Sequence, residues 1–193
     1  MLVVLLAADL TIFDQEWYEN KFEQYNSYKN IEASERTINK QAGNILTYIQ
    51  SKESLRPILL NEKEQRHMAD VRQLVTKGHQ LLVVLVLLHL VLWIQIKEKR
   101  KTLLYASLLT LVLLGAIVTM PFEKIFVLFH LAVFVNDLWL LNPLTDNLVN
   151  MYPQRIFQTL AIKIGITANL LALIGLAIGL YKQKWRKKLW QKS

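Results

Sequence analysis

The stretch TLLYASLLTLVLLGAIVTM, residues 102–120, decides the fold class, because it is apolar and carries no charged side chain. A helix needs about 20 mostly apolar residues to cross about 30 Å of hydrocarbon, and this stretch meets that requirement. Residues 160–181 meet it with one charge, Lys163, whose flexible stem can reach the headgroups from near the helix end. Residues 81–96, LLVVLVLLHLVLWIQI, are slightly short and include one histidine. The sequence therefore predicts an all-α integral membrane protein, with three clear transmembrane helices at residues 78–97, 102–120 and 159–181.

The surplus positive charge is concentrated in two short segments that flank these helices. The loop KEKRK, residues 97–101, holds four basic side chains and one acidic side chain, and the tail, residues 182–193, holds six basic ones. Residues 11–77 instead hold ten of each sign, within a chain whose net charge is +8. Because basic loops stay on the cytoplasmic side, we expect the C-terminal tail in the cytoplasm, and residues 11–77 and 121–158 outside. Basic residues beside spanning helices serve topology and anionic lipids, so no nucleic-acid partner is predicted.

A fourth apolar stretch, IFVLFHLAVFVNDLWLL at residues 125–141, resembles a further span. If it crossed the membrane, the last helix would reverse and the basic tail would be external. The stretch also includes His130, Asn136 and Asp137, which are costly in lipid unless they face protein or water. We therefore predict that residues 121–158 contain an interfacial or re-entrant segment at the outer face.

The first ten residues, MLVVLLAADL, are apolar but too short to span a bilayer. They also lack the basic start of a signal peptide. Because residues 11–77 are expected outside, we expect residues 1–10 to be the outer end of a truncated first transmembrane helix.

Residues 11–77 are predicted to form a small helical extracellular domain. The aromatic side chains of Trp17, Tyr18, Phe22 and Tyr25 are spaced three or four apart, which is typical of an amphipathic helix with interfacial aromatics. A second helix is predicted near residues 34–49, where apolar residues recur at helical spacing.

One polar motif, NEKEQRHMADV at residues 61–71, belongs to this domain. On a helix, Glu64, His67 and Asp70 share one face, because they are three residues apart. A carboxylate beside an imidazole fixes its tautomer and raises its basicity, which suits a general base. The same spacing also fits a solvated, charge-rich helix face.

A second polar cluster lies in FHLAVFVNDLWLLNPLTDNLVNMYP, residues 129–153. Its polar members are His130, Asn136, Asp137, Asp146 and Asn147. Polar groups within apolar sequence at a membrane need partners or a function. Asp146 is readily explained as a cap or turn residue near Pro143, whereas His130 between two apolar residues is not. The predicted topology brings both polar clusters to the outer side.

Several classes of chemistry find no support in the sequence. The chain has no cysteine, which excludes thiol catalysis and disulfides, and it has no G-x-S-x-G or HExxH motif. The paired histidines fit an acid–base enzyme, a metal-dependent membrane hydrolase, or a non-enzymatic scaffold or sensor. Of the other histidines, we expect His79 at the membrane interface and His89 in packing or an interhelical hydrogen bond. Gly175 and Gly179 in the last helix form a G-x-x-x-G pattern, which suits close helix packing.

The motifs HMADV (67–71) and FHLAVFVNDLWLLNP followed by TDNL (129–148) resemble the lipoprotein intramolecular transacylase (Lit) family of Gram-positive bacteria. The resemblance covers nearly the whole chain and departs only at the N-terminus, where the family has a full first spanning helix. It implies an enzyme of the bacterial plasma membrane, active at the outer leaflet among membrane lipids. The implied reaction moves the sn-2 acyl chain of a diacylglyceryl lipoprotein to the α-amine of its N-terminal cysteine, giving a lyso-form lipoprotein.

This resemblance also implies roles for individual residues. We expect His67 and His130 to be the catalytic acid–base pair, without metal or cofactor. Asp70 or Asp137 is expected to orient one of them. Asn136 is a candidate donor to the oxyanion or the headgroup, Trp139 a candidate wall for the acyl chains, and Asp146 a further supporting residue.

Overall fold

The computed structural model describes residues 2–51, 53–118 and 120–190, and these ranges contain helices and connecting loops but no β-strand. In chain order the elements are α1 (Leu2–Thr11), α2 (Gln15–Gln24), the 3-10 helix η1 (Ser27–Lys29), α3 (Glu35–Gln50), α4 (Glu62–Gln95), α5 (Lys99–Val118), α6 (Phe122–Val133), α7 (Asn147–Met151) and α8 (Gln154–Trp190).

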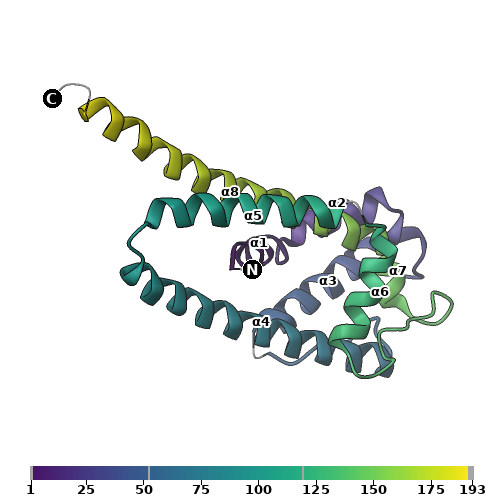
Figure 1. The fold of residues 1–193 in the computed structure, drawn as a ribbon. Coiled ribbons are helices and arrows are strands. Elements are labelled where there is room, and N and C mark those ends of the chain that lie inside the picture. The colour runs from purple at the N-terminus through teal and green to yellow at the C-terminus, as the bar shows by residue number, and fades with distance from the viewer. Residues whose placement is uncertain (1, 52, 119, 191–193) are drawn as a thin grey trace.

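The long helices α4, α5 and α8 extend to one side of the molecule, and the short helices α2, α3, α6 and α7 gather at the other end (Figure 1). Helix α5 packs along α8, and α1 lies against both α8 and α4. The turn between α4 and α5 and the C-terminal end of α8 both lie at the end away from the short helices (Figure 1). The two basic segments of the sequence are therefore at the same end of the molecule. The side chains of residues 182–193 lie outside the described residues.

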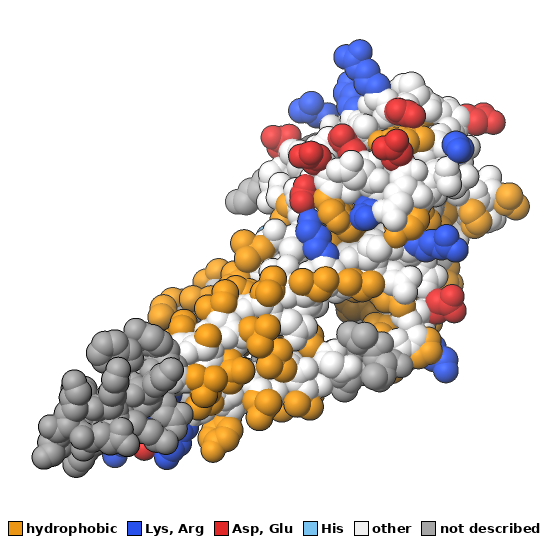
Figure 2. All heavy atoms as spheres, turned by 90° about the horizontal axis from the view of Figure 1, so that it is seen from above, with side chains coloured by type: hydrophobic (Ala, Val, Ile, Leu, Met, Phe, Trp, Pro, Cys, Tyr) orange, Lys and Arg blue, Asp and Glu red, His pale blue; other side chains and the backbone are white. Residues whose placement is uncertain are grey.

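Two of the described helices, α4 and the Gln154–Ile178 part of α8, are long and apolar enough to cross a membrane. None of the most apolar window of α4 is buried inside the protein, and only 11% of that of α8 is. A core helix of a soluble domain would bury such side chains, so these surfaces require an apolar surrounding. Figure 2 shows hydrophobic side chains along the long helices and charged ones mainly over the short-helix end.

Of the other two predicted membrane-spanning helices, one is only partly described and the other is too short to cross the membrane. Helix α5 covers most of residues 102–120, but residue 119 and the side chains of 116–118 lie outside the described residues. This third span therefore stays a prediction. Helix α1 has 10 residues, or about 15 Å, which is half the thickness of the hydrocarbon. Its assignment as the end of a spanning helix likewise stays a prediction.

Helix α4 runs without a break from the polar motif into the apolar segment. Its 34 residues begin at a capping box, in which Asn61 and Glu64 each satisfy the other's backbone N–H. His67 therefore stands on the same rigid helix as the apolar segment, on the domain side of it.

The fourth apolar stretch of the sequence is not one continuous helix. Helix α6 has 12 residues, about 18 Å, which is too short to cross the hydrocarbon. It is followed by an irregular segment up to Asp146.

The short-helix end has its own hydrophobic core. Phe22 of α2, Ile38 of α3 and Ile156 at the start of α8 are fully buried. The aromatic rings of Tyr18 and Phe22 meet that of Tyr152 edge to face, at centroid distances of 5.6 and 5.2 Å. Two of the regularly spaced aromatic residues of α2, Tyr18 and Phe22, thus face this core.

This domain is also tied to α8 by a charged contact. Lys163 Nζ lies 2.9 Å from Asp14 Oδ2 at the N-cap of α2 and 5.0 Å from the ring centre of Trp17. Lys163 thus reaches polar groups of the domain, as its flexible stem allows.

Candidate active site

The two predicted catalytic histidines lie together. His67 comes from α4 and His130 from α6, and their ring centroids are 6.5 Å apart. Their side chains are almost fully buried, with 7% and 9% of each residue exposed. The fold therefore brings the two polar motifs of the sequence to one place.

An apolar cavity of about 430 Å³ lies beside these rings. Its wall is formed by both histidines and by mostly aliphatic and aromatic side chains from α2, α3, α4, α6, α7 and α8, together with Ile12 just after α1. On α4 the lining residues run from His67 to Val75, about 12 Å along the helix axis. The volume lies in the range of small-ligand pockets, and the lining suits a hydrocarbon chain rather than a polar ligand.

His130 has a defined tautomer. Its Nδ1 lies 2.7 Å from the carbonyl oxygen of Phe126, one turn earlier on α6. Because a carbonyl only accepts hydrogen bonds, Nδ1 carries the proton, and in the neutral ring Nε2 keeps a lone pair. Burial lowers the pKa of His130 below its usual value, while this hydrogen bond opposes the shift. The ring is packed by Phe126 and Trp139, at centroid distances of 4.2 and 4.8 Å.

His67 is a neutral ring at physiological pH. Burial lowers the pKa of His67 to about 4, with a further lowering from nearby His130, whereas the charge of Asp70 acts to raise it. Its Nδ1 is buried without a hydrogen-bond partner in the part of the chain that the structure describes. His67 therefore has a low basicity and is free to interact with a group that enters the cavity.

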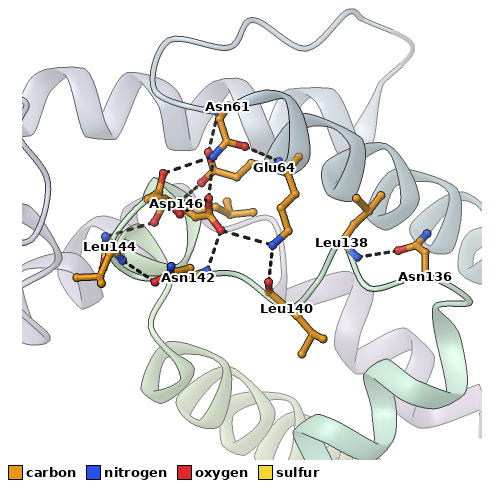
Figure 3. Close-up of polar contacts among 12 residues, drawn as sticks. Asn61, Glu64, Asn136, Leu138, Leu140, Asn142, Leu144 and Asp146 are labelled. Atoms are coloured by element: carbon orange, nitrogen blue, oxygen red, sulfur yellow. Dashed lines mark hydrogen bonds and ion pairs between the residues drawn. The ribbon is translucent and has the colours of Figure 1, made fainter.

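Of the two aspartates predicted to orient a histidine, Asp70 is the one near the pair. Asn136 Nδ2 donates to Asp70 Oδ2 over 2.9 Å. Asn136 Oδ1 accepts from the backbone N–H of Leu138 over 3.1 Å (Figure 3). The amide thus ties the loop after α6 to α4. Asp137 is exposed, and its side chain has no contact with either histidine among the described hydrogen bonds and ion pairs.

Asp146 is part of a separate polar network (Figure 3). Its Oδ1 accepts from Asn61 Nδ2 over 2.8 Å, and its Oδ2 accepts from the backbone N–H of Asn142 over 2.7 Å. Lys63 Nζ lies 3.8 Å from the same carboxylate and also donates to the carbonyl of Leu140. Asp146 therefore holds the loop in place and does not touch the histidines.

Glu64 completes this network from α4. It is fully buried, and its carboxylate accepts the backbone N–H of Asn61 over 2.7 Å and that of Leu148 in the first turn of α7. Burial raises the pKa of Glu64 despite these hydrogen bonds. Sequence reasoning placed Glu64 on the face of His67 but missed Asn61 and Lys63. The capping-box pattern of Asn61 and Glu64 was the available signal.

The remaining histidines lie outside the cavity lining. His79 of α4 contacts the carboxylate of Asp9 on α1. His89 is exposed, and its Nδ1 bonds to the carbonyl of Leu85 over 2.8 Å within the same helix. The expectation of packing or an interhelical hydrogen bond is therefore wrong for His89, because it faces away from the other helices. Among the described residues, no three His, Asp or Glu side chains form a group that could hold a metal ion.

Among known proteins, one family model matches the sequence, and solved structures of one protein share the fold. The family model described as "Lipoprotein intramolecular transacylase Lit" matches residues 1–157. No curated protein matches the chain. A solved structure of the membrane integral lipoprotein intramolecular transacylase Lit from Bacillus cereus superposes with a TM-score of 0.86 at 21% identity, covering 97% of this chain and 91% of that one. Two structures of the same Bacillus cereus protein, with one histidine replaced by arginine or alanine, superpose with a TM-score of 0.80 at 21% identity; they cover 97% of this chain and 88% and 89% of theirs.

Proposed function

This chain belongs to the lipoprotein intramolecular transacylase (Lit) family, and on that premise we propose that it moves the sn-2 acyl chain of a diacylglyceryl lipoprotein to the α-amine of the lipoprotein's own N-terminal cysteine. The product is a lyso-form lipoprotein. The observation that carries this proposal is the pair of buried imidazoles, 6.5 Å apart, on the wall of a long apolar cavity.

The reaction requires no nucleophile from the enzyme. The α-amine nitrogen attacks the ester carbonyl carbon of the same molecule, the new C–N bond forms, and the bond from that carbon to the glyceryl oxygen breaks. The amine loses a proton and the glyceryl oxygen gains one. The enzyme's tasks are to hold amine and ester together, to move this proton, and to stabilise the oxyanion.

We assign the proton transfer to His130. Its Nδ1–H is held by Phe126, so the lone pair of Nε2 is free to take the proton of the attacking amine and then return it to the glyceryl oxygen. The α-amine has an ordinary pKa of about 7.7–8.0, so part of it is already neutral near pH 7. A histidine whose pKa is lowered by burial matches this task, because it is neutral and ready to accept.

His67 serves as the hydrogen-bond donor in this proposal. Since its pKa is about 4, it stays neutral, and we assign to it the N–H that stabilises the oxyanion without giving up its proton. The carboxylate of Asp70, held by Asn136, favours the positive charge that develops on the imidazole pair. Trp139, packed on His130, forms a wall for the acyl chains.

The site is proposed to face the outer leaflet. The basic loop and tail at the far end of the molecule support a cytoplasmic C-terminus, and the cavity then lies at the opposite, outer end (Figure 1). This position matches a substrate whose acyl chains rest in the outer leaflet and whose peptide lies outside.

Expression of the full chain in a bacterium that makes only diacyl lipoproteins tests the proposal. The variants are His67→Ala and His130→Ala, and His89→Ala is the matched control because it removes an exposed imidazole from the same helix as His67. Mass spectrometry of a lipoprotein N-terminal peptide should show the lyso form with the wild type and with His89→Ala, and only the diacyl form with the other two. Normal N-acylation in both active-site variants, at equal amounts of membrane-inserted protein, would contradict the assignment.

A further inference from the structure

The cavity beside the histidines ends at a defined depth. Its lining on α4 reaches no further than Val75, two turns beyond His67, and its lining on α8 reaches no further than Ile164. Both helices continue well past these residues, so the cavity occupies only the part of the bundle next to the short-helix domain.

A polar contact between α1 and α4 lies just beyond the last cavity-lining residue of α4. His79 lies one turn beyond Val75 on the same face of α4, and its ring contacts the carboxylate of Asp9 on α1. Ile12, one turn after Asp9, still lines the cavity. A hydrocarbon chain that went deeper would have to separate these two polar groups, and the loss of their hydrogen bond opposes that.

On α8, a row of apolar residues forms the wall of the cavity. Phe157, Leu160, Ala161 and Ile164 recur at helical spacing and all face the cavity. Ala161 has the smallest side chain in the whole lining. A larger residue at this position would therefore fill space along the α8 wall of the cavity.

We propose that this deep end, formed by Val75, Ala161 and Ile164 beside the Asp9–His79 contact, sets the length of the acyl chain that the enzyme transfers. The inference rests on the proposed transacylase function and adds a specificity to it. A chain longer than the cavity would have to push apart the side chains packed at its deep end, so it should be transferred less well than a chain that ends there. The preferred chain is therefore the longest one that ends at this contact.

A competition experiment with purified full-length protein tests this length limit. The probes are equimolar dimyristoyl, dipalmitoyl and distearoyl glyceryl-cysteine lipopeptides, and mass spectrometry gives the ratio of the three N-acyl products. Ala161→Phe should shift the product ratio toward the shorter chain, because the larger side chain takes up space that the end of a longer chain needs. Ile164→Ala, which deepens the cavity, should shift it toward the longer chain. Ile162→Phe is the control, because Ile162 is exposed and lies outside the cavity lining.

The outcomes separate this inference from the proposed function. Opposite shifts in the two variants, with the wild-type ratio in Ile162→Phe, support the length limit. Unchanged ratios in Ala161→Phe and Ile164→Ala, with N-acylation intact, overturn it and leave the transacylase function standing. If Ala161→Phe fails to fold, Ile164→Ala alone decides between these two results. A wild-type protein that yields no N-acyl product would instead sink the proposed function.

Discussion

Asn136 Nδ2 donates a hydrogen bond to Asp70 Oδ2 over 2.9 Å, so an amide from the loop after α6 holds a carboxylate on α4, one turn from His67. The same side chain accepts a hydrogen bond from the backbone of Leu138, next to Trp139. One residue thereby connects the carboxylate beside one histidine with the loop that packs on the other. The sequence-based prediction of Asn136 as a donor to the substrate stays a prediction, and the structure adds this internal hydrogen bond.

The hydrogen bond between Asn136 and Asp70 predicts that its removal lowers the rate of N-acylation. Asn136→Ala removes a hydrogen bond to a charged group, and we expect the rate of N-acylation to fall by roughly ten- to a hundredfold. Asp137→Ala removes the exposed neighbour and should stay near the wild-type rate. The measurement is the initial rate with a diacylglyceryl lipopeptide in detergent. Equal rates for Asn136→Ala and the wild type would show that the tie is dispensable.

Burial of neutral His67 predicts a pH-dependent stability. Its pKa lies near 4 in the folded protein and 6.5 is its ordinary value, so the unfolded chain binds more protons between these two values. The contribution of His67 is therefore fully present above about pH 6.5 and is lost as the pH falls toward 4. The loss amounts to at most about 3 kcal/mol.

Thermal unfolding of the purified protein between pH 7 and pH 4 checks this sign. His67→Gln should flatten the fall in Tm relative to the wild type, because the substituted side chain does not titrate. His89→Gln should keep the wild-type slope. A wild-type slope in His67→Gln would mean that this ring is not buried in its neutral form.

The network of Glu64 predicts a large effect on stability. Glu64→Ala leaves the backbone N–H groups of Asn61 and Leu148 without their acceptor, and we expect a loss of about 2–5 kcal/mol in the free energy of unfolding. Glu64→Gln keeps one acceptor oxygen and should lose less. Glu62→Ala, an exposed change in the same turn, should have little effect. Denaturant titration of the three variants gives the order, and equal values for Glu64→Ala and Glu62→Ala would refute it.

The packing of α5 on α8 predicts a difference between two glycines of α8. A Cβ at Gly175 would lie 3.0 Å from Ser107 Oγ and 3.4 Å from Leu103 Cδ1, whereas nothing lies within 4 Å of one at Gly165. Gly175→Leu should therefore push the helices apart and cost about 1–3 kcal/mol. Gly165→Leu should be tolerated. The Tm values of both variants in detergent test this, and a Tm loss confined to Gly165→Leu would contradict the packing. The other glycine of the predicted pattern, Gly179, lies in a part of α8 whose side-chain surroundings are outside what the structure describes.

Local patterns in the sequence were enough to predict the membrane helices and the residues that share a helix face. Hydropathy predicted α4 and α8 as membrane helices, and helical spacing put Glu64, His67 and Asp70 on one face. The pairing of His67 with His130 came from topology together with the family motifs. The distance between the rings required the fold.

The partners of the polar side chains were beyond the reach of the sequence. Spacing put Glu64 on the face of His67. It could not show that Glu64 accepts from the backbone N–H of Leu148 in α7, or that Asp146 accepts from the side chain of Asn61 at the start of α4. The structure adds internal hydrogen bonds for Asn136 and Asp146, and their expected roles toward the substrate stay predictions. The cavity likewise arises only where several helices meet, so no single segment of the chain encodes it.

The most direct test of the central claim follows the acyl chain itself. Purified protein is given a diacylglyceryl lipopeptide that carries an isotopic label only in its sn-2 chain, and the product is analysed by tandem mass spectrometry. The account predicts that the label moves to the α-amine of the same molecule, with a free hydroxyl at the glyceryl carbon, and that His67→Ala and His130→Ala abolish this transfer. Label released as free fatty acid, or transfer that persists in both variants, would contradict it.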